Sequence, residues 1–254
     1  MSANEISVQA AIEEAPGCAR RLLAMAARHR AQHPLINAHQ TIREWVPDAG
    51  TYCYQTHIAI SDQPYERLAW LTDVFYHAAT LDQQPWYPQF QGGRSQPCSL
   101  PPKEAITDHQ LAWGRFDLGL GTPRYYRQLV SLGRPTLRTS VIVARSVDDG
   151  PPLPAGARLA YTQGPNGEVL QWQDGCLHWH HICCTPGAGL LPAKLDRWLI
   201  NGLRRLGLDS AERKTYRQEA LQLRDWLHHQ QHGDSVSGAP VSVELLNGTA
   251  RPQP

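Results

Sequence analysis

The sequence lacks the features of several large protein classes. Its 254 residues contain no run of 18 apolar residues, so no transmembrane helix is expected. The N-terminus has no basic stretch followed by an apolar one, so no signal peptide is expected. The formal net charge is only +1, which argues against a nucleic-acid partner because such proteins need a concentrated basic surface.

Cysteine is scarce, and local catalytic motifs are missing. Six scattered cysteines are too few for a disulfide framework in a chain of this length, so free thiols and a cytoplasmic location are expected. The sequence has no Gly-x-Ser-x-Gly nucleophile elbow, no phosphate-cradling glycine loop and no Cys-x-x-Cys or His-Glu-x-x-His metal motif. No cofactor is therefore expected. The apolar share of 41% is enough to form a sizeable core.

The first third of the chain alternates between helical and strand patterns. Apolar spacing predicts a helix over 5–30, broken at Pro16 and Gly17. Residues 51–60 are rich in β-branched and aromatic side chains and predict a strand. Ser61 or Asp62 then predicts the N-cap of a second helix, and the Gly, Ser, Pro and Gln of 91–102 predict a loop.

The middle of the chain predicts a series of strands, followed by helix. The expected strands are Ile106–Leu118, Tyr125–Leu132, Leu137–Val147, Ala157–Thr162, Val169–Trp172 and Cys176–Cys184. Asn166-Gly167 predicts a hairpin between the fourth and fifth of them. Residues 190–231 carry apolar side chains at helical spacing, and the polar composition after His232 predicts a disordered tail.

Three stretches resemble the START and Bet v 1-like superfamily, which includes lipid-transfer domains and polyketide cyclases. They are DVFYHAATLDQQPWYPQF (73–90), VIVARSVDDGPPLPAGARLAY (141–161) and CCTPGAGLLPAKLDRWLINGL (183–203). The resemblance implies an α+β fold, in which a curved antiparallel sheet wraps around a long C-terminal helix, with an extra N-terminal helix. The expected organisation is an N-terminal helical segment over 1–46, a helix-grip domain over 47–231 and a tail over 232–254.

The resemblance implies a hydrophobic small molecule enclosed between the sheet and the C-terminal helix. The apolar candidates for its lining are Tyr54, Ile58, Val143, Leu177, Trp179, Leu195, Trp198 and Leu199. Among six arginines on or near the predicted strands, Arg145 is the candidate for a charged contact to the ligand, because its strand is otherwise apolar. The alternative interpretation is that the apolar residues only fill a solid core.

The densest group of reactive side chains is the Cys176–Cys184 stretch. On a strand, His178 and His180 share one face with Cys176, and such a pair can chelate a metal ion if further ligands come from elsewhere. They can equally face solvent or line a polar wall. Together with His57 they are also candidates for acid–base catalysis, because histidine titrates near neutral pH.

Three functional hypotheses follow. The first is a non-enzymatic binder or carrier of a lipid-like or polyketide-like molecule. The second is a cyclase or dehydratase on the same scaffold that uses His57, His178 or His180. The third is an interaction module whose contact patch consists of exposed Trp86, Tyr87 and Phe90.

Overall fold

The computed structural model describes residues 6–33, 35, 38–46, 51–78, 90–116, 124–150, 152, 155, 158–160, 164–184, 218 and 221–227. Within them, the helices and strands are α1 (Val8–Gln32), β1 (His39–Val46), β2 (Thr51–Ile60), α2 (Glu66–Tyr76), β3 (Phe90–Pro97), β4 (Ile106–Phe116), β5 (Arg124–Thr136), β6 (Thr139–Ser146), β7 (Arg158–Leu159), β8 (Gly167–Gln173) and β9 (Cys176–Cys183). A short helical segment covers 221–227.

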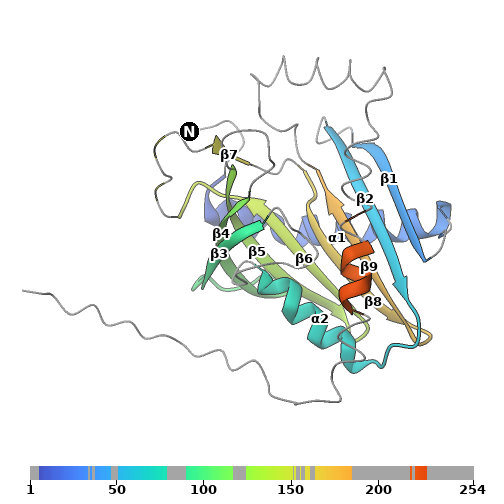
Figure 1. Cartoon of the computed structure of the whole chain (residues 1–254). Helices are drawn as coiled ribbons and strands as arrows, with labels where there is room; N and C mark the ends of the chain where they lie inside the picture. Colours follow the sequence, from blue (N-terminus) through green and yellow to red (C-terminus); the bar gives the residue numbers. More distant parts are fainter. Residues whose placement is uncertain are drawn as a thin grey trace, which may run out of the picture.

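The strands form one curved sheet with the order β1-β2-β9-β8-β6-β5-β4-β3 (Figure 1). Neighbours along this path are antiparallel, and β7 adds a short parallel pairing with β5. The pairing of β2 with β9 joins the early part of the chain to the last of the described strands. The antiparallel sheet that the resemblance implied is therefore confirmed.

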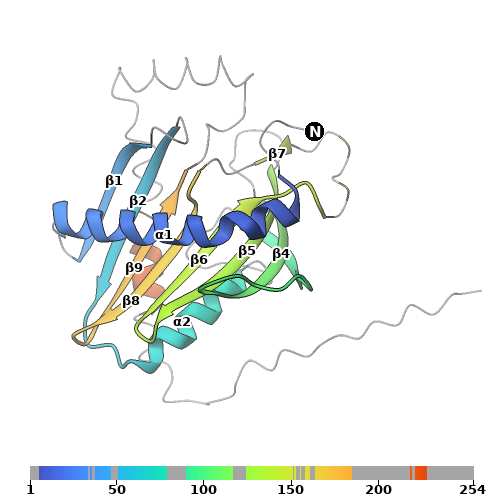
Figure 2. The same cartoon turned by 180° about the vertical axis from the view of Figure 1, so that it is seen from behind.

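The two faces of the sheet carry different helices. Helix α1 crosses one face, as Figure 2 shows. Helix α2 and the 221–227 segment lie against the other face (Figure 1), where Leu223 and Leu227 join Leu68 and Leu71 in one apolar cluster. Because successive side chains on a strand point to opposite faces, each strand contributes to both layers. The molecule is thus an α+β structure in which a sheet lies between an N-terminal helix and a C-terminal one.

Helix α1 is continuous, although a break was predicted at Pro16 and Gly17. It begins after Ser7, whose hydroxyl accepts a hydrogen bond from the Ala10 N–H at 3.2 Å, and it runs to Gln32. A proline inside a helix lacks one hydrogen bond, at a cost of about 3 kcal/mol. Burial of the apolar stripe on both sides of Pro16 offsets this cost, because Ile12 and Leu22 are completely enclosed against the sheet.

Two strands were not predicted. β1 lies within the segment expected to be helical, and the boundary expected between 46 and 47 falls between two paired strands, β1 and β2. β3 lies in the stretch expected to be a loop. It is the last strand of the sheet, contains Gly92 and Gly93, and ends at Pro97, a composition that is tolerated at an edge where one side needs no hydrogen-bonding partner.

The predicted hairpin at Asn166-Gly167 was wrong. β7 pairs with β5, and β8 pairs with β6 and β9, so no hairpin joins β7 to β8. The tight hairpin joins β8 to β9 at Asp174-Gly175, where both residues have positive φ (53° and 77°), as a type I′ turn requires. Similarly, α2 begins only at Glu66, with Tyr65 rather than Ser61 or Asp62 at the N-cap.

The expectation that all cysteines are free thiols was wrong for one pair. Cys53 of β2 and Cys184 after β9 are joined by a disulfide, with their Cα atoms 4.2 Å apart. The pairing of Tyr54 with Cys183 brings these two neighbours opposite each other at the end of the β2–β9 ladder. Cys18, Cys98, Cys176 and Cys183 are not part of a disulfide.

Candidate functional site

The face of the sheet beneath α2 is a continuous apolar surface. Six neighbouring strands of the sheet, β2, β9, β8, β6, β5 and β4, each contribute at least one buried side chain to this surface. Helix α2 and the 221–227 segment cover it. The buried members from the sheet are Ile58, Ile60, Ala112, Val130, Leu132, Ile142, Leu170, Leu177 and Trp179. The alternation of the strands explains this composition, because every second residue points to this side.

Aromatic rings connect this surface to its cover. The ring of Trp179 on β9 stacks on Phe75 of α2, with the ring centroids 5.6 Å apart. Trp70 of α2 stacks on Trp226 of the C-terminal segment at 5.5 Å. The indole N–H of Trp179 is buried and has no hydrogen-bond partner among the described residues. A buried donor of this kind is stabilised when an acceptor faces it.

Four of the predicted lining residues lie on this face. Ile58, Leu177 and Trp179 belong to its apolar cluster, and Tyr54 shares their side by strand alternation and is only 5% exposed. Leu195, Trp198 and Leu199 fall outside the residues that the structure describes.

Val143 and Arg145 do not lie on this face. Val143 is buried in the cluster beneath α1, on the opposite side of the sheet. The guanidinium of Arg145 pairs with Glu14 of α1 (Nη2–Oε2, 2.5 Å) and donates to the Gly164 carbonyl at 3.1 Å. The reason is the register of β6, in which odd-numbered residues face α1. The prediction that these two residues line the space beside the C-terminal helix is therefore corrected.

The candidate histidines gather on the α1 face instead. His57 Nε2 and His178 Nδ1 share a hydrogen bond at 3.0 Å, and the rings of His57 and His180 stack with centroids 3.9 Å apart. His29 of α1 completes the group, with its ring centroid 6.0 Å from those of both His57 and His180. We call these four residues the histidine cluster.

The histidine cluster is held in its neutral form. Burial, reinforced by the neighbouring His178, lowers the pKa of His57 to about 3. Burial, reinforced by His33, lowers the pKa of His29 to about 4. Burial and the adjacent His57 likewise hold the pKa of His180 well below its usual value. Imidazoles with such values remain deprotonated at neutral pH, so they cannot donate the second ring proton that a general acid needs.

The histidine cluster does not form a metal centre in the described part of the chain, where no three His, Cys, Asp or Glu side chains are arranged to hold an ion. The stacking of His57 on His180 places the rings face to face, whereas metal ligands point their nitrogens at one centre. Cys176 lies four residues from His180 on the same strand and has a pKa raised by burial.

His29 was missed by the sequence reasoning. It follows Ile12, Leu22 and Met25 at helical spacing along the buried stripe of α1 and is itself only 1% exposed. That position was the available signal, because a histidine on the apolar stripe of a helix must meet the sheet. Which strands it meets depends on the tertiary structure.

Comparison with known proteins places the fold. No family model and no curated protein matches the sequence. The comparison with solved structures shows that the chain has the START-like helix-grip fold. Human StAR-related lipid transfer protein 5 is similar over 85% of this chain and 99% of its own, with a TM-score of 0.52 and 14% identity. A fragment of a StAR-related lipid transfer protein from Xanthomonas axonopodis matches 66% of this chain and 86% of its own, at 12% identity and a TM-score of 0.48. At these identities the similarity shows the fold alone.

No helix in the described ranges is both long and apolar enough to cross a membrane.

Proposed function

We propose that the protein binds a hydrophobic small molecule on the sheet face beneath α2 and the C-terminal helical segment. The observation that carries this proposal is a continuous apolar surface in which the indole N–H of Trp179 is buried without a hydrogen-bond partner among the described residues. Ligand pockets typically combine an apolar lining with a few placed polar groups. The START-like fold of the chain supports the same assignment, since the similar human protein is described as a lipid transfer protein.

The ligand class follows from the chemistry of this face. The apolar part of the ligand contacts the leucine, isoleucine and tryptophan side chains of this face. A hydroxyl or carbonyl oxygen of the ligand accepts a hydrogen bond from the Trp179 N–H. A lipid-like or polyketide-like molecule has both features. Binding rather than catalysis is the favoured activity, because His57, His178 and His180 lie on the opposite side of the sheet with neutral, buried rings.

The interaction-module hypothesis loses one of its three anchors. Phe90 is buried, with 5% of its surface exposed, and its ring lies 6.5 Å from that of Tyr126. A side chain in this position is part of the core rather than of a contact patch. Trp86 and Tyr87 lie outside the described residues.

The direct test is organic extraction of the purified full-length protein followed by mass analysis, together with titration of an apolar fluorescent dye. Ile58→Ala and Ile182→Ala form a matched pair, because both isoleucines are completely buried on adjacent strands but face opposite sides. Each is expected to cost about 2–5 kcal/mol of folding stability. Only Ile58→Ala should alter dye affinity or the amount of extracted ligand. Equal effects of both variants, measured under conditions where both remain folded, would contradict the proposed face.

A second variant tests the polar contact. Trp179→Phe keeps an aromatic ring against Phe75 but removes the N–H, so we expect retention of an alkane-like dye and roughly tenfold weaker binding of a ligand that carries a hydroxyl or carbonyl. Unchanged selectivity between the two ligands would show that Trp179 acts only as packing.

A further inference from the structure

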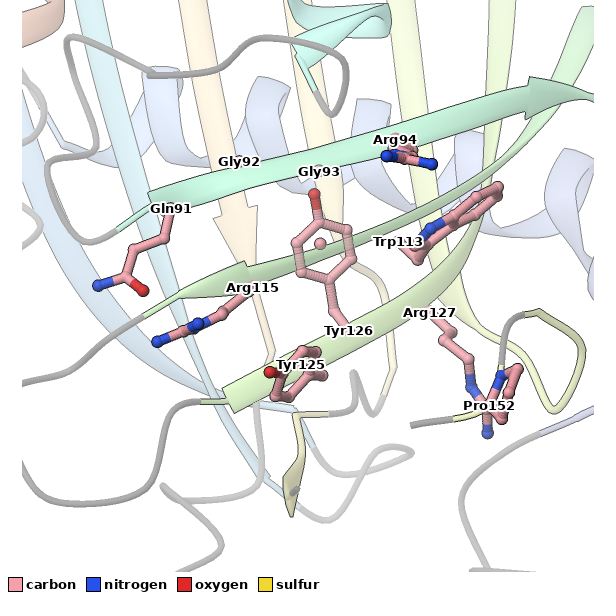
Figure 3. Close-up of a pocket in the computed structure, with 11 residues that line it drawn as sticks. Gln91, Gly92, Gly93, Arg94, Trp113, Arg115, Tyr125, Tyr126, Arg127 and Pro152 are labelled. Atoms are coloured by element: carbon pink, nitrogen blue, oxygen red, sulfur yellow. The ribbon is translucent and has the colours of Figure 1, made fainter. Parts of the chain in front are cut away.

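An open hollow of about 380 Å³ lies against β3, β4 and β5, at the end of the sheet. Figure 3 shows its lining, in which three arginines surround aromatic side chains. The side chains used below are Arg94, Trp113, Arg115, Tyr125, Arg127 and Pro152. None of them belongs to the apolar surface beneath α2.

Strand register places the charged and aromatic groups on one face. Trp113 of β4 is paired with Arg94 on one side and with Arg127 on the other. Arg115 is paired with Tyr125 and lies two residues from Trp113 on the same strand. Because alternate residues of a strand share a face, Arg115 and Tyr125 point to the same side of the sheet as Arg94, Trp113 and Arg127. Trp113 packs at the edge of the cluster beneath the N-terminal half of α1. These charged and aromatic side chains therefore lie on the α1 side of the sheet, whereas Tyr126, which also lines the hollow, packs against the apolar cluster of the other face.

Glycines keep the hollow open. The pairing of β3 with β4 shifts between Phe90 and Gly93, and Gly92 has a φ of 92°, a conformation that glycine adopts without strain. Gly92 and Gly93 have no side chains, so β3 places no side chain at these two positions beside Arg115. On the other face, the ring of Tyr126 occupies the space over Gly114, where an added Cβ would approach its hydroxyl oxygen to 2.5 Å. The floor of the hollow is thus backbone supported by a tyrosine ring.

The positive charge at the hollow is local. Arg94 and Arg115 are exposed, and within the described ranges neither forms an ion pair or a hydrogen bond. Arg127 contributes a third guanidinium, and its stem packs beside Gly150. In a chain with a net charge of +1, this concentration of arginines is not a property of the whole surface. It favours an anionic group at this position.

We propose that this hollow binds the phosphate monoester group of a ligand, with Arg94 and Arg115 as the two principal contacts. A phosphate monoester carries a charge of about −1.5 to −2 at neutral pH, which matches two guanidinium groups. Guanidinium forks bind phosphate oxygens in a bidentate manner. Trp113 and Tyr125 provide flat apolar surface for the organic part of the ligand. The site is additional to the hydrophobic site and does not depend on it.

Two sources supply this chemistry, a soluble organic phosphate and the headgroup of an anionic lipid. The test therefore uses two probes with the full-length protein. Glycerol 3-phosphate is titrated in a calorimeter, and phosphatidylcholine vesicles with and without phosphatidate are used in flotation. The key variant is Arg94→Gln/Arg115→Gln. The matched control is Arg20→Gln/Arg134→Gln, which removes the same charge from exposed arginines that pair with Glu104 and Asp73 elsewhere.

We expect the wild-type protein to bind at least one probe, the key variant to lose about tenfold or more in affinity, and the control to change by less than about twofold. Binding of glycerol 3-phosphate without vesicle flotation supports a soluble ligand, and phosphatidate-dependent flotation alone supports a lipid headgroup. No binding of either probe, or equal losses in both double variants, would overturn the proposal. Dye binding at the hydrophobic site should be the same in all three proteins, which separates this test from that of the proposed function.

Discussion

Acid should destabilise this protein through the histidine cluster. In the folded state, burial holds the pKa of His57 at about 3 and that of His29 at about 4, against an ordinary value of 6.5. Above pH 6.5 the rings are neutral in both states, so their contribution to stability is fully present. As the pH falls below 6.5, the unfolded chain binds protons that the folded chain cannot bind, and this contribution is lost progressively toward pH 3.

The size of the expected loss in folding stability follows from how far the histidine pKa values are lowered. At pH 5 an unfolded histidine lies about 1.5 pH units below its pKa, which corresponds to about 2 kcal/mol for each ring that stays neutral in the folded state. We therefore expect about 1–2 kcal/mol for His57 alone. One group acts in the opposite direction. Burial lowers the pKa of His181, but the Glu168 carboxylate outweighs burial and raises it, so this pair stabilises the fold below pH 6.5.

The assay compares variants so that the opposing groups cancel. The free energy of unfolding is measured in urea at pH 7.5 and pH 5 for the wild type, for His57→Gln and for His181→Gln. We expect His57→Gln to lose about 1–2 kcal/mol less than the wild type over this interval and His181→Gln to lose more than the wild type, because the two histidines shift in opposite directions. An identical loss in His57→Gln and the wild type would show that His57 is not the source of the pH dependence.

Two further predictions concern glycine and the C-terminus. Gly167 has a φ of 151°, and a Cβ there would lie 1.9 Å from the Ile142 carbonyl oxygen, whereas Gly175 has a φ of 77° and no atom within 4 Å. Gly167→Ala should therefore cost about 3 kcal/mol or more in urea unfolding and Gly175→Ala only about 1 kcal/mol; equal costs would contradict the β6–β8 contact. Deletion of residues 233–254 should leave the melting temperature unchanged in differential scanning calorimetry, because the tail is too polar to bury much surface, and a lower melting temperature would contradict that reading of its composition.

The strands that were predicted best are those whose side chains repeat most regularly. Thr51–Ile60 was predicted with the bounds that β2 has, and Ile106–Leu118 nearly matches β4. β3 was missed because its glycines and proline are typical of loops, and only pairing with β4 makes it a strand. The hairpin was assigned to Asn166-Gly167 rather than to Asp174-Gly175, since both dipeptides carry the same local signal.

The candidate site was predicted in part for a related reason. Alternation correctly grouped Tyr54 with Ile58, and His178 with His180, because it depends only on the geometry of each strand. It could not relate the faces of different strands. Val143 and Arg145 were therefore assigned to the side of Ile58, although they pack beneath α1.

The sequence by itself determined the positions of most strands and the sets of residues that share a face, because these depend on local periodicity. The fold class came from the resemblance of three sequence stretches to the START and Bet v 1-like superfamily. The tertiary structure alone decided which set meets which helix. That choice joined His29 to three histidines from β2 and β9, left the Trp179 N–H within an apolar layer, and gathered Arg94, Arg115 and Arg127 around one hollow. The physical reason is that pairing between distant strands fixes the relative position of their faces, and no local pattern contains that register.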